Sequence, residues 1–373
     1  MTSQQPTPGA TAGTAARGAG RRWKRRLVRA GLGVVGLCVS VTLIASVFFR
    51  IQLRPSLQFI PRFEVGEWVS DLPAHLPWLA VFVVLTALII PLRALQWRFT
   101  LGDNAPPFKA RYHAVAIGAF FHNAIPGKLG DIIRSWYLAR RAKLPFFHSL
   151  ASVLVGKLLE FAALIVVVAV SLMIPTGSEA TGEDSTARLG AAIPVAAGIF
   201  AGLLLAVLAL GRYSPRWAAA LERKNQMPKL RLVLLNLADG MHAMRSPKKA
   251  AQAFLASILP VLAPAIAYGV ALQALGVPRG LLAGGVVLGA IALGQLAIGL
   301  PIGIGMYYAL SSWAARALGA DPSQAAALAL LTHVATFGTQ LLVGLCSLLV
   351  QKQSLRDLLR RRKAIEAEFK QAE

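Results

Sequence analysis

Residues 120–141 read FFHNAIPGKLGDIIRSWYLARR, and this stretch decides how the chain is organised. It begins as the end of an apolar segment, breaks at Pro126-Gly127, and restarts at Gly130 as a polar helix that carries arginines. A break of this kind inside a bilayer must face protein or water, because hydrocarbon cannot satisfy free backbone N–H and C=O groups. The stretch is therefore the first candidate for a functional site.

The composition is typical of a membrane protein. Of the 373 residues, 56% are hydrophobic and 15% are charged. Several uncharged apolar runs reach the roughly 20 residues that a transmembrane helix needs. The net charge of +23 comes from Lys and Arg in short loops beside these runs. That placement indicates cytoplasmic loops and contact with anionic lipid heads, so we predict no nucleic-acid partner.

The chain is predicted to have three regions. Residues 1–20 form a disordered tail, residues 21–350 form the membrane domain, and residues 351–373 form a basic cytoplasmic helix. Basic residues precede the first apolar run and follow the last one, which places both termini in the cytoplasm. A basic connection within 188–249 links two halves of the membrane domain.

The expected fold is all-α, a polytopic membrane protein with about seven full transmembrane helices plus two re-entrant helical hairpins. The hairpins are 111–141 and 280–318, because 129–141 is too short and too charged to cross a membrane. Arg93 is assigned to the basic loop after the second span. The expected spans include 27–49, 77–95, 149–174, 188–211, 250–275 and 323–350.

A repeated break supports this arrangement. The Pro-x-x-x-Gly pattern of Pro126–Gly130 returns 175 residues later at Pro301–Gly305, and the apolar runs around the two breaks correspond in order. Each half, 77–174 or 250–350, then consists of a span, a broken hairpin and a second span. The two halves begin on opposite sides of the membrane, so we predict an inverted repeat, an arrangement that recurs in secondary transporters.

The segment from Phe121 to Arg134 resembles the signature of the lysylphosphatidylglycerol synthase transmembrane-region family, a flippase-like membrane domain. The shared pattern is an Asn, apolar residues, Pro-Gly, Gly-Asp and then Arg. The later segment 300–305, which contains Gly303, is similar to that family's second Gly-rich turn. The resemblance covers about residues 75–350. It implies a bacterial inner-membrane protein that moves aminoacylated or other polar-headed lipids.

The chain departs from the family pattern at several positions. A Glu and an Arg are common where this chain has Tyr308 and His333, and a Glu-Arg pair is displaced here to Lys157 and Glu160. The aminoacyl-transferase domain of the synthases is not expected, since the chain ends at Glu373. We therefore carry over the membrane domain without the lipid-modifying activity, and we predict that the protein is not an enzyme.

Charged side chains at membrane depth cost several kcal/mol unless they are paired or hydrated, so each is a functional candidate. Lys128 and Arg134 lie near the first turn of the restarted helix, where free N–H groups and two cations suit a phosphate. Two alternatives stay open: both cations are interfacial, or Asp131 pairs with Arg134 along one helix face.

Three further side chains are candidates within the spans. Lys157 and Glu160 would line a cavity, or they would neutralise each other as a packing pair. His333 would bind substrate, or it would be a hydrogen-bonded packing residue. The complete set of candidate substrate-binding residues is Asn123, Pro126, Gly127, Lys128, Gly130, Asp131, Arg134, Lys157, Glu160, Pro301, Gly303, Gly305 and His333.

Two functions remain open at this point. The sequence contains no nucleophile elbow, zinc motif, phosphate-binding loop or carboxylate cluster, so no catalytic residue, metal or cofactor is predicted. The leading hypothesis is a lipid flippase or headgroup transporter for an anionic or aminoacylated lipid. The alternative is an accessory membrane subunit that presents lipid to a separate synthase or glycosyltransferase. Membrane lipids are the expected partners, with a lipid-modifying enzyme and a second copy of the chain as further candidates.

Overall fold

The computed structural model is almost entirely helical. Phe49–Gln52 (β1) and Gln58–Pro61 (β2) form a short antiparallel ribbon, so the all-α prediction was wrong here. The FRIQ sequence of β1 alternates apolar and polar residues, which favours a strand. The structure describes residues 31, 34–52, 58–62, 66, 72–103, 105–124, 129–173, 246–277, 279–295 and 303–352, with short parts of 194–235.

Among these residues, four helices are long and apolar enough to cross a membrane. They are α3 (Leu72–Leu101), α6 (Phe146–Met173), α9 (Pro247–Ala274) and α12 (Pro322–Val350). Each has 28 to 30 residues. At 1.5 Å per residue, such a helix is roughly 42–45 Å long, which exceeds a bilayer core of about 30 Å. The chain therefore has the framework of a multi-pass membrane protein.

The remaining predicted spans are only partly described. A shorter apolar helix, Val34–Phe48, lies within the expected span 27–49. Most of 188–211 lies outside the described residues, as do the tail 1–20 and the basic segment beyond residue 352. The second predicted span, 77–95, is longer than expected at both ends, because it corresponds to α3.

Two pairs of shorter helices lie between the long ones. The first pair is α4 (Phe108–Ala124) and α5 (Gly130–Ala142). The second is α10 (Gly284–Gln295), which follows the short 3₁₀ helix η2 (Leu281–Ala283), and α11 (Gly303–Ala317). These four helices have 12 to 17 residues each. Each is therefore roughly 18–26 Å long.

The links inside these pairs, 125–128 and 296–302, lie outside the described residues. Four of the candidate residues fall there, and the structure therefore places none of them: Pro126, Gly127, Lys128 and Pro301. The predicted restart of the first hairpin at Gly130 is confirmed by the first residue of α5.

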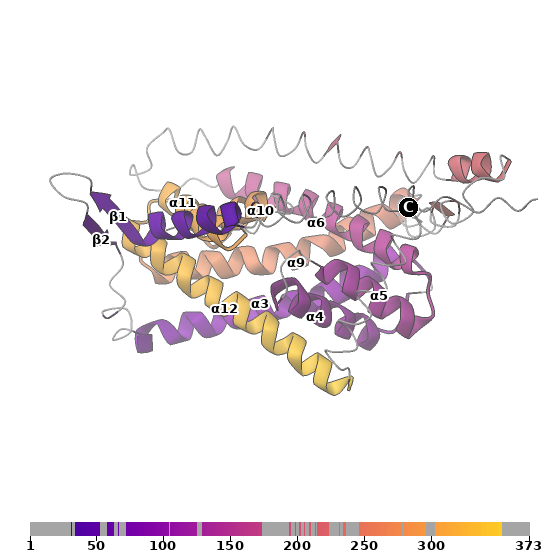
Figure 1. The fold of residues 1–373 in the computed structure, drawn as a ribbon, viewed down its shortest axis with the longest axis horizontal. Helices are drawn as coiled ribbons and strands as arrows, with labels where there is room; N and C mark the ends of the chain where they lie inside the picture. Colours follow the sequence, from indigo (N-terminus) through magenta and orange to yellow (C-terminus); the bar gives the residue numbers. More distant parts are fainter. Residues whose placement is uncertain are drawn as a thin grey trace, which may run out of the picture.

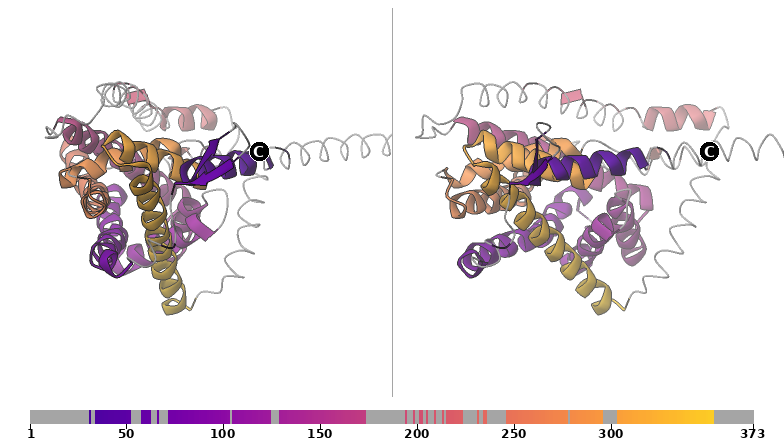
Figure 2. Two further views of the ribbon diagram at one scale, coloured as in Figure 1. Left: turned by 90° about the vertical axis from the view of Figure 1, so that its left-hand side faces the viewer. Right: turned by 60° about the vertical axis from the view of Figure 1, so that its left-hand side comes forward.

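The two halves meet along α3 and α9, which lie side by side at the centre of the molecule (Figure 1). The helices are antiparallel, because the Phe82 and Tyr268 rings touch at 5.4 Å while Gln96 hydrogen-bonds Ser257 at 2.8 Å. Around this pair, α4 packs against α5 and α12, whereas α10 packs against α11 and α6. Figure 2 shows α12 crossing the bundle obliquely.

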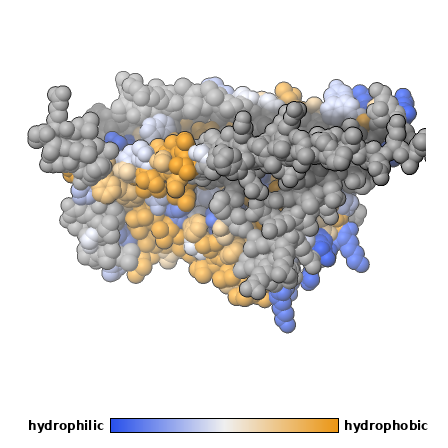
Figure 3. All heavy atoms as spheres, in the orientation of Figure 1, coloured by the Kyte–Doolittle hydropathy of each residue, from blue (hydrophilic) through white to orange (hydrophobic). Residues whose placement is uncertain are grey.

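The surface is divided by polarity along the bundle. Hydrophobic atoms cover much of the middle of the visible face, and hydrophilic atoms gather towards the end at which α5 lies (Figure 3). Exposed basic residues occur near the ends of α3, α4 and α5, namely Arg98, Lys109, Arg140 and Arg141. Positive charge of this kind marks the cytoplasmic ends of membrane helices.

Glycines allow close helix contacts in both halves. A Cβ atom on Gly130 would lie 2.3 Å from the carbonyl oxygen of Gly118, so α4 and α5 meet backbone to backbone. A Cβ on Gly269 of α9 would lie 1.8 Å from the carbonyl oxygen of Leu281 in η2. Small residues are typical of such contacts, because helices in lipid gain little from hydrophobic burial and rely on close packing.

Gly269→Ala is expected to destabilise the protein, since the new methyl group must displace the backbone at Leu281. Overpacking of this kind costs about 1–3 kcal/mol. The matched control is Gly338→Ala in α12, where a Cβ atom meets nothing within 4 Å. Thermal unfolding of both variants in detergent tests this, and equal melting temperatures would contradict the close contact.

Candidate functional site

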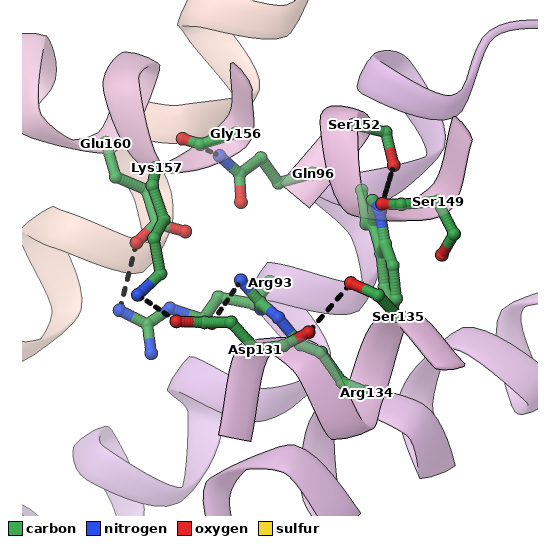
Figure 4. A network of polar contacts seen from close by, with 11 residues as sticks. Arg93, Gln96, Asp131, Arg134, Ser135, Ser149, Ser152, Gly156, Lys157 and Glu160 are labelled. Atoms are coloured by element: carbon green, nitrogen blue, oxygen red, sulfur yellow. Dashed lines mark hydrogen bonds and ion pairs between the residues drawn. The ribbon is translucent and has the colours of Figure 1, made fainter. Parts of the chain in front are cut away.

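Charged side chains from three helices meet inside the first half. Arg93 of α3 donates from Nη2 to Oε2 of Glu160 of α6 at 2.9 Å. Asp131 of α5 accepts from Nη2 of Arg134 at 3.0 Å and also pairs with Lys157 of α6. Figure 4 shows these five side chains converging, and we refer to them as the charged network.

Lys157 and Glu160 reach two different helices. They are three residues apart on α6, so their side chains lie on one face of the helix. Lys157 pairs with α5, whereas Glu160 pairs with α3. The interpretation that these two residues neutralise each other was therefore wrong. The predicted pair of Asp131 and Arg134 is confirmed, although Asp131 also binds a second cation.

Uncharged groups hold the network in place. The Arg134 guanidinium lies over the Trp97 ring at 5.5 Å, and the Trp97 indole N–H donates to Ser152 Oγ at 2.9 Å. Gln96 Nε2 donates to the carbonyl oxygen of Gly156 at 3.0 Å. Figure 4 places these polar residues on the helices that carry the ion pairs. The amide and indole of α3 therefore fix its position against α6.

The network is partly open at its cations. The Asp131 and Glu160 side chains are 24% and 14% exposed, and Arg134 is 12% exposed. Arg93 and Lys157 are 40% and 45% exposed. The Nε atoms of Arg93 and Arg134 are buried without a hydrogen-bond partner in the described part of the chain. Three cations face two carboxylates, so the network has a formal charge of +1.

Sequence reasoning missed Arg93. It was assigned to a loop after residue 95, but α3 continues to Leu101 and Arg93 lies within the helix. The available signal was the sequence after it, where Gln96 and Trp97 continue a helical pattern with buried polar groups. A cation this far inside a long apolar helix requires a counter-ion, and Glu160 supplies it.

The other described candidates lie away from the network. Asn123 Nδ2 donates to Gln340 Oε1 of α12 at 2.7 Å, near the end of α4. Gly303 begins α11, and Gly305 is buried where its N–H donates to Ser40 Oγ of the Val34–Phe48 helix at 2.9 Å. His333 Nδ1 lies 3.2 Å from the Tyr308 hydroxyl. The predicted residues therefore form several contacts rather than one site.

The second half has a neutral polar cluster. The hydroxyl groups of Tyr268 (α9) and Tyr307 (α11) are 2.8 Å apart, and that of Tyr307 is 2.9 Å from Thr332 Oγ1 (α12). We refer to these three residues as the hydroxyl cluster. The His333 ring packs beside it, 4.7 Å from the Tyr307 ring, which fits a hydrogen-bonded packing residue. In the parts of the chain that the structure describes, no three His, Cys, Asp or Glu residues are grouped to hold a metal ion.

The fold and the network define a polytopic helical membrane domain with charged groups held between its helices. Residues 33–344 match the family model described as the lysylphosphatidylglycerol synthase TM region, and the chain belongs to this family. No curated protein and no solved structure matches the chain in the same kind of comparison.

The Arg93–Glu160 pair can be tested by exchanging its charges. Arg93→Glu or Glu160→Arg alone places like charges in contact, which is expected to destabilise the protein by about 1–3 kcal/mol, since Arg93 is partly exposed. The double variant Arg93→Glu/Glu160→Arg restores opposite charges and is expected to recover most of this loss. A double variant that melts no higher than the worse single variant would show that the two side chains do not interact.

Proposed function

We propose that this protein moves a polar-headed lipid across the membrane and catalyses no reaction itself. The observation that carries the proposal is a positively charged network at membrane depth. Glu160 has 14 residues before it and 13 after it in α6, so it lies near the middle of a membrane-spanning helix. Charges at that depth are rare and mark transport pathways.

A lipid phosphate fits the open side of this network. Arg93 and Lys157 are its most exposed cations, and the buried Nε atoms of Arg93 and Arg134 lack partners among the described residues. A phosphate oxygen accepts charge-assisted hydrogen bonds from guanidinium and ammonium groups. The acyl chains would remain in the surrounding hydrocarbon while these groups replace water around the headgroup.

The proposed architecture has about seven transmembrane helices and two re-entrant hairpins that form an inverted repeat. Helix neighbours support the repeat. The contacts of α4 with α5 and α12 are matched by those of α10 with α11 and α6, with α3 and α9 at the centre. The hairpin helices are shorter than the roughly 20 residues that a span needs, which supports re-entrance.

The proposed orientation follows from the positions of the basic residues. Arg98, Lys109, Arg140 and Lys249 lie near the same ends of α3, α4, α5 and α9, and we assign this end to the cytoplasm. The first hairpin then opens inwards, the second opens outwards, and both chain termini are cytoplasmic. The bacterial inner membrane is the proposed location.

Arg93→Gln and Lys157→Gln are each expected to slow lipid flipping by about tenfold, because each removes a cation that is open to a phosphate. The control is Arg98→Gln, an exposed arginine in the last turn of α3, which should change the rate less than twofold. The measurement is the loss of headgroup accessibility in liposomes that contain the purified protein and a fluorescent anionic lipid. Unchanged rates in both network variants would remove the network from the pathway.

The alternative of an accessory subunit remains in this experiment. A protein that only presents lipid to a separate enzyme would retain bound lipid without flipping it. Wild-type protein that binds anionic lipid but gives no flipping above empty liposomes would favour that function over transport.

A further inference from the structure

Carboxylates are scarce in the two halves. Only four Asp or Glu residues occur there. Asp103 follows α3 and binds Lys249 at 2.7 Å, and Asp321 caps the first turn of α12. Asp131 and Glu160 remain inside the bundle, and both are already paired with cations. The interior of the two halves therefore offers no free carboxylate to a cationic headgroup.

The charged network has the opposite preference. Its formal charge is +1, and the cations Arg93 and Lys157 are more exposed than the carboxylates that they pair with. An anion that approaches this open side meets the cations first and neutralises the excess charge. An ammonium group meets like charge in a region of low dielectric constant, where repulsion is poorly screened.

The corresponding place in the second half adds no negative charge. Tyr268 and Thr332 lie 175 residues after Arg93 and Lys157, which is the spacing of the two predicted breaks. Tyr307 begins one residue beyond the same spacing from Asp131, and it joins the other two hydroxyl groups at 2.8 and 2.9 Å. An ion pair in one half is thus replaced by three neutral hydroxyl groups in the other.

We propose that the transported lipid has a net negative headgroup without an ammonium group, and that aminoacylated lipids are excluded. This inference rests on the proposed lipid transport and narrows its substrate to an anionic phosphodiester lipid whose outer headgroup is uncharged. The selective element is the excess positive charge at Arg93, Arg134 and Lys157, together with the lack of a free carboxylate in either half.

The first test compares two lipids that differ at the headgroup alone. The full chain is placed in liposomes with acyl-labelled phosphatidylglycerol or its lysyl ester, and loss of the label on the outer face is followed after dithionite is added. Phosphatidylglycerol is expected to flip at least about tenfold faster. Equal rates, or faster flipping of the lysyl ester, would overturn the inference and leave the proposed function standing.

Failure of the proposed function has a different result. If neither lipid flips, the transport proposal fails, and native mass spectrometry of the purified protein then tests the inference separately. Retention of phosphatidylglycerol over the lysyl ester from an equal mixture supports it, and the reverse order contradicts it.

The second test changes the charge of the network. Lys157→Glu changes its formal charge from +1 to −1, so the rate for the lysyl ester relative to phosphatidylglycerol should rise at least about tenfold. Lys157→Arg preserves the charge and should preserve the wild-type preference. Lys157→Gln should shift the preference in the same direction but less, and it serves where Lys157→Glu does not insert stably. An unchanged preference in Lys157→Gln and Lys157→Glu would show that the network does not select the headgroup.

Discussion

The carboxylate of Asp131 links the first hairpin to the long helices. It binds Arg134 on its own helix and Lys157 on α6. Moving α5 away from α6 would leave Lys157 without a counter-ion at membrane depth, where an unpaired charge costs several kcal/mol. An anion that binds Lys157 in place of Asp131 lowers this cost. In the proposed cycle, lipid binding and hairpin movement are therefore coupled through one shared cation, which gives the ligand a differential affinity for two arrangements.

The glycine contacts determine which parts can move. Gly130 meets the backbone of Gly118, so α4 and α5 pack as one unit, and a Cβ atom on Gly284 would lie 2.0 Å from the carbonyl oxygen of Ala265 in α9. Contacts this close have few alternative arrangements, since interiors are packed without room for small shifts. The contact between α5 and α6 instead depends on the ion pair of Asp131 and Lys157. Rearrangement is cheaper at that contact than within either glycine-packed pair.

Local features were predictable from the sequence, whereas their long-range partners were not. Helix restart at Gly130 and the Asp131–Arg134 pair follow from residue type and spacing within one helix. Arg93 was misassigned because counting charges beside apolar runs cannot distinguish an interior cation from one in a loop. The partners of Lys157 and Glu160 could not be derived either, because they belong to α5 and α3, and spacing along α6 says nothing about which helices adjoin it.

The two halves share a helix arrangement but differ in chemistry, and this difference has a thermodynamic consequence for the proposed transport. The charged network attracts a phosphate, while the hydroxyl cluster of Tyr268, Tyr307 and Thr332 offers only neutral hydrogen bonds. A headgroup therefore resides longer in the first half than in the second. Residence at a site changes the rate of crossing but not the equilibrium distribution of lipid between leaflets, because the protein returns to its starting state after each cycle. Net movement in one direction thus requires a free-energy source, such as a lipid gradient maintained by synthesis on one side.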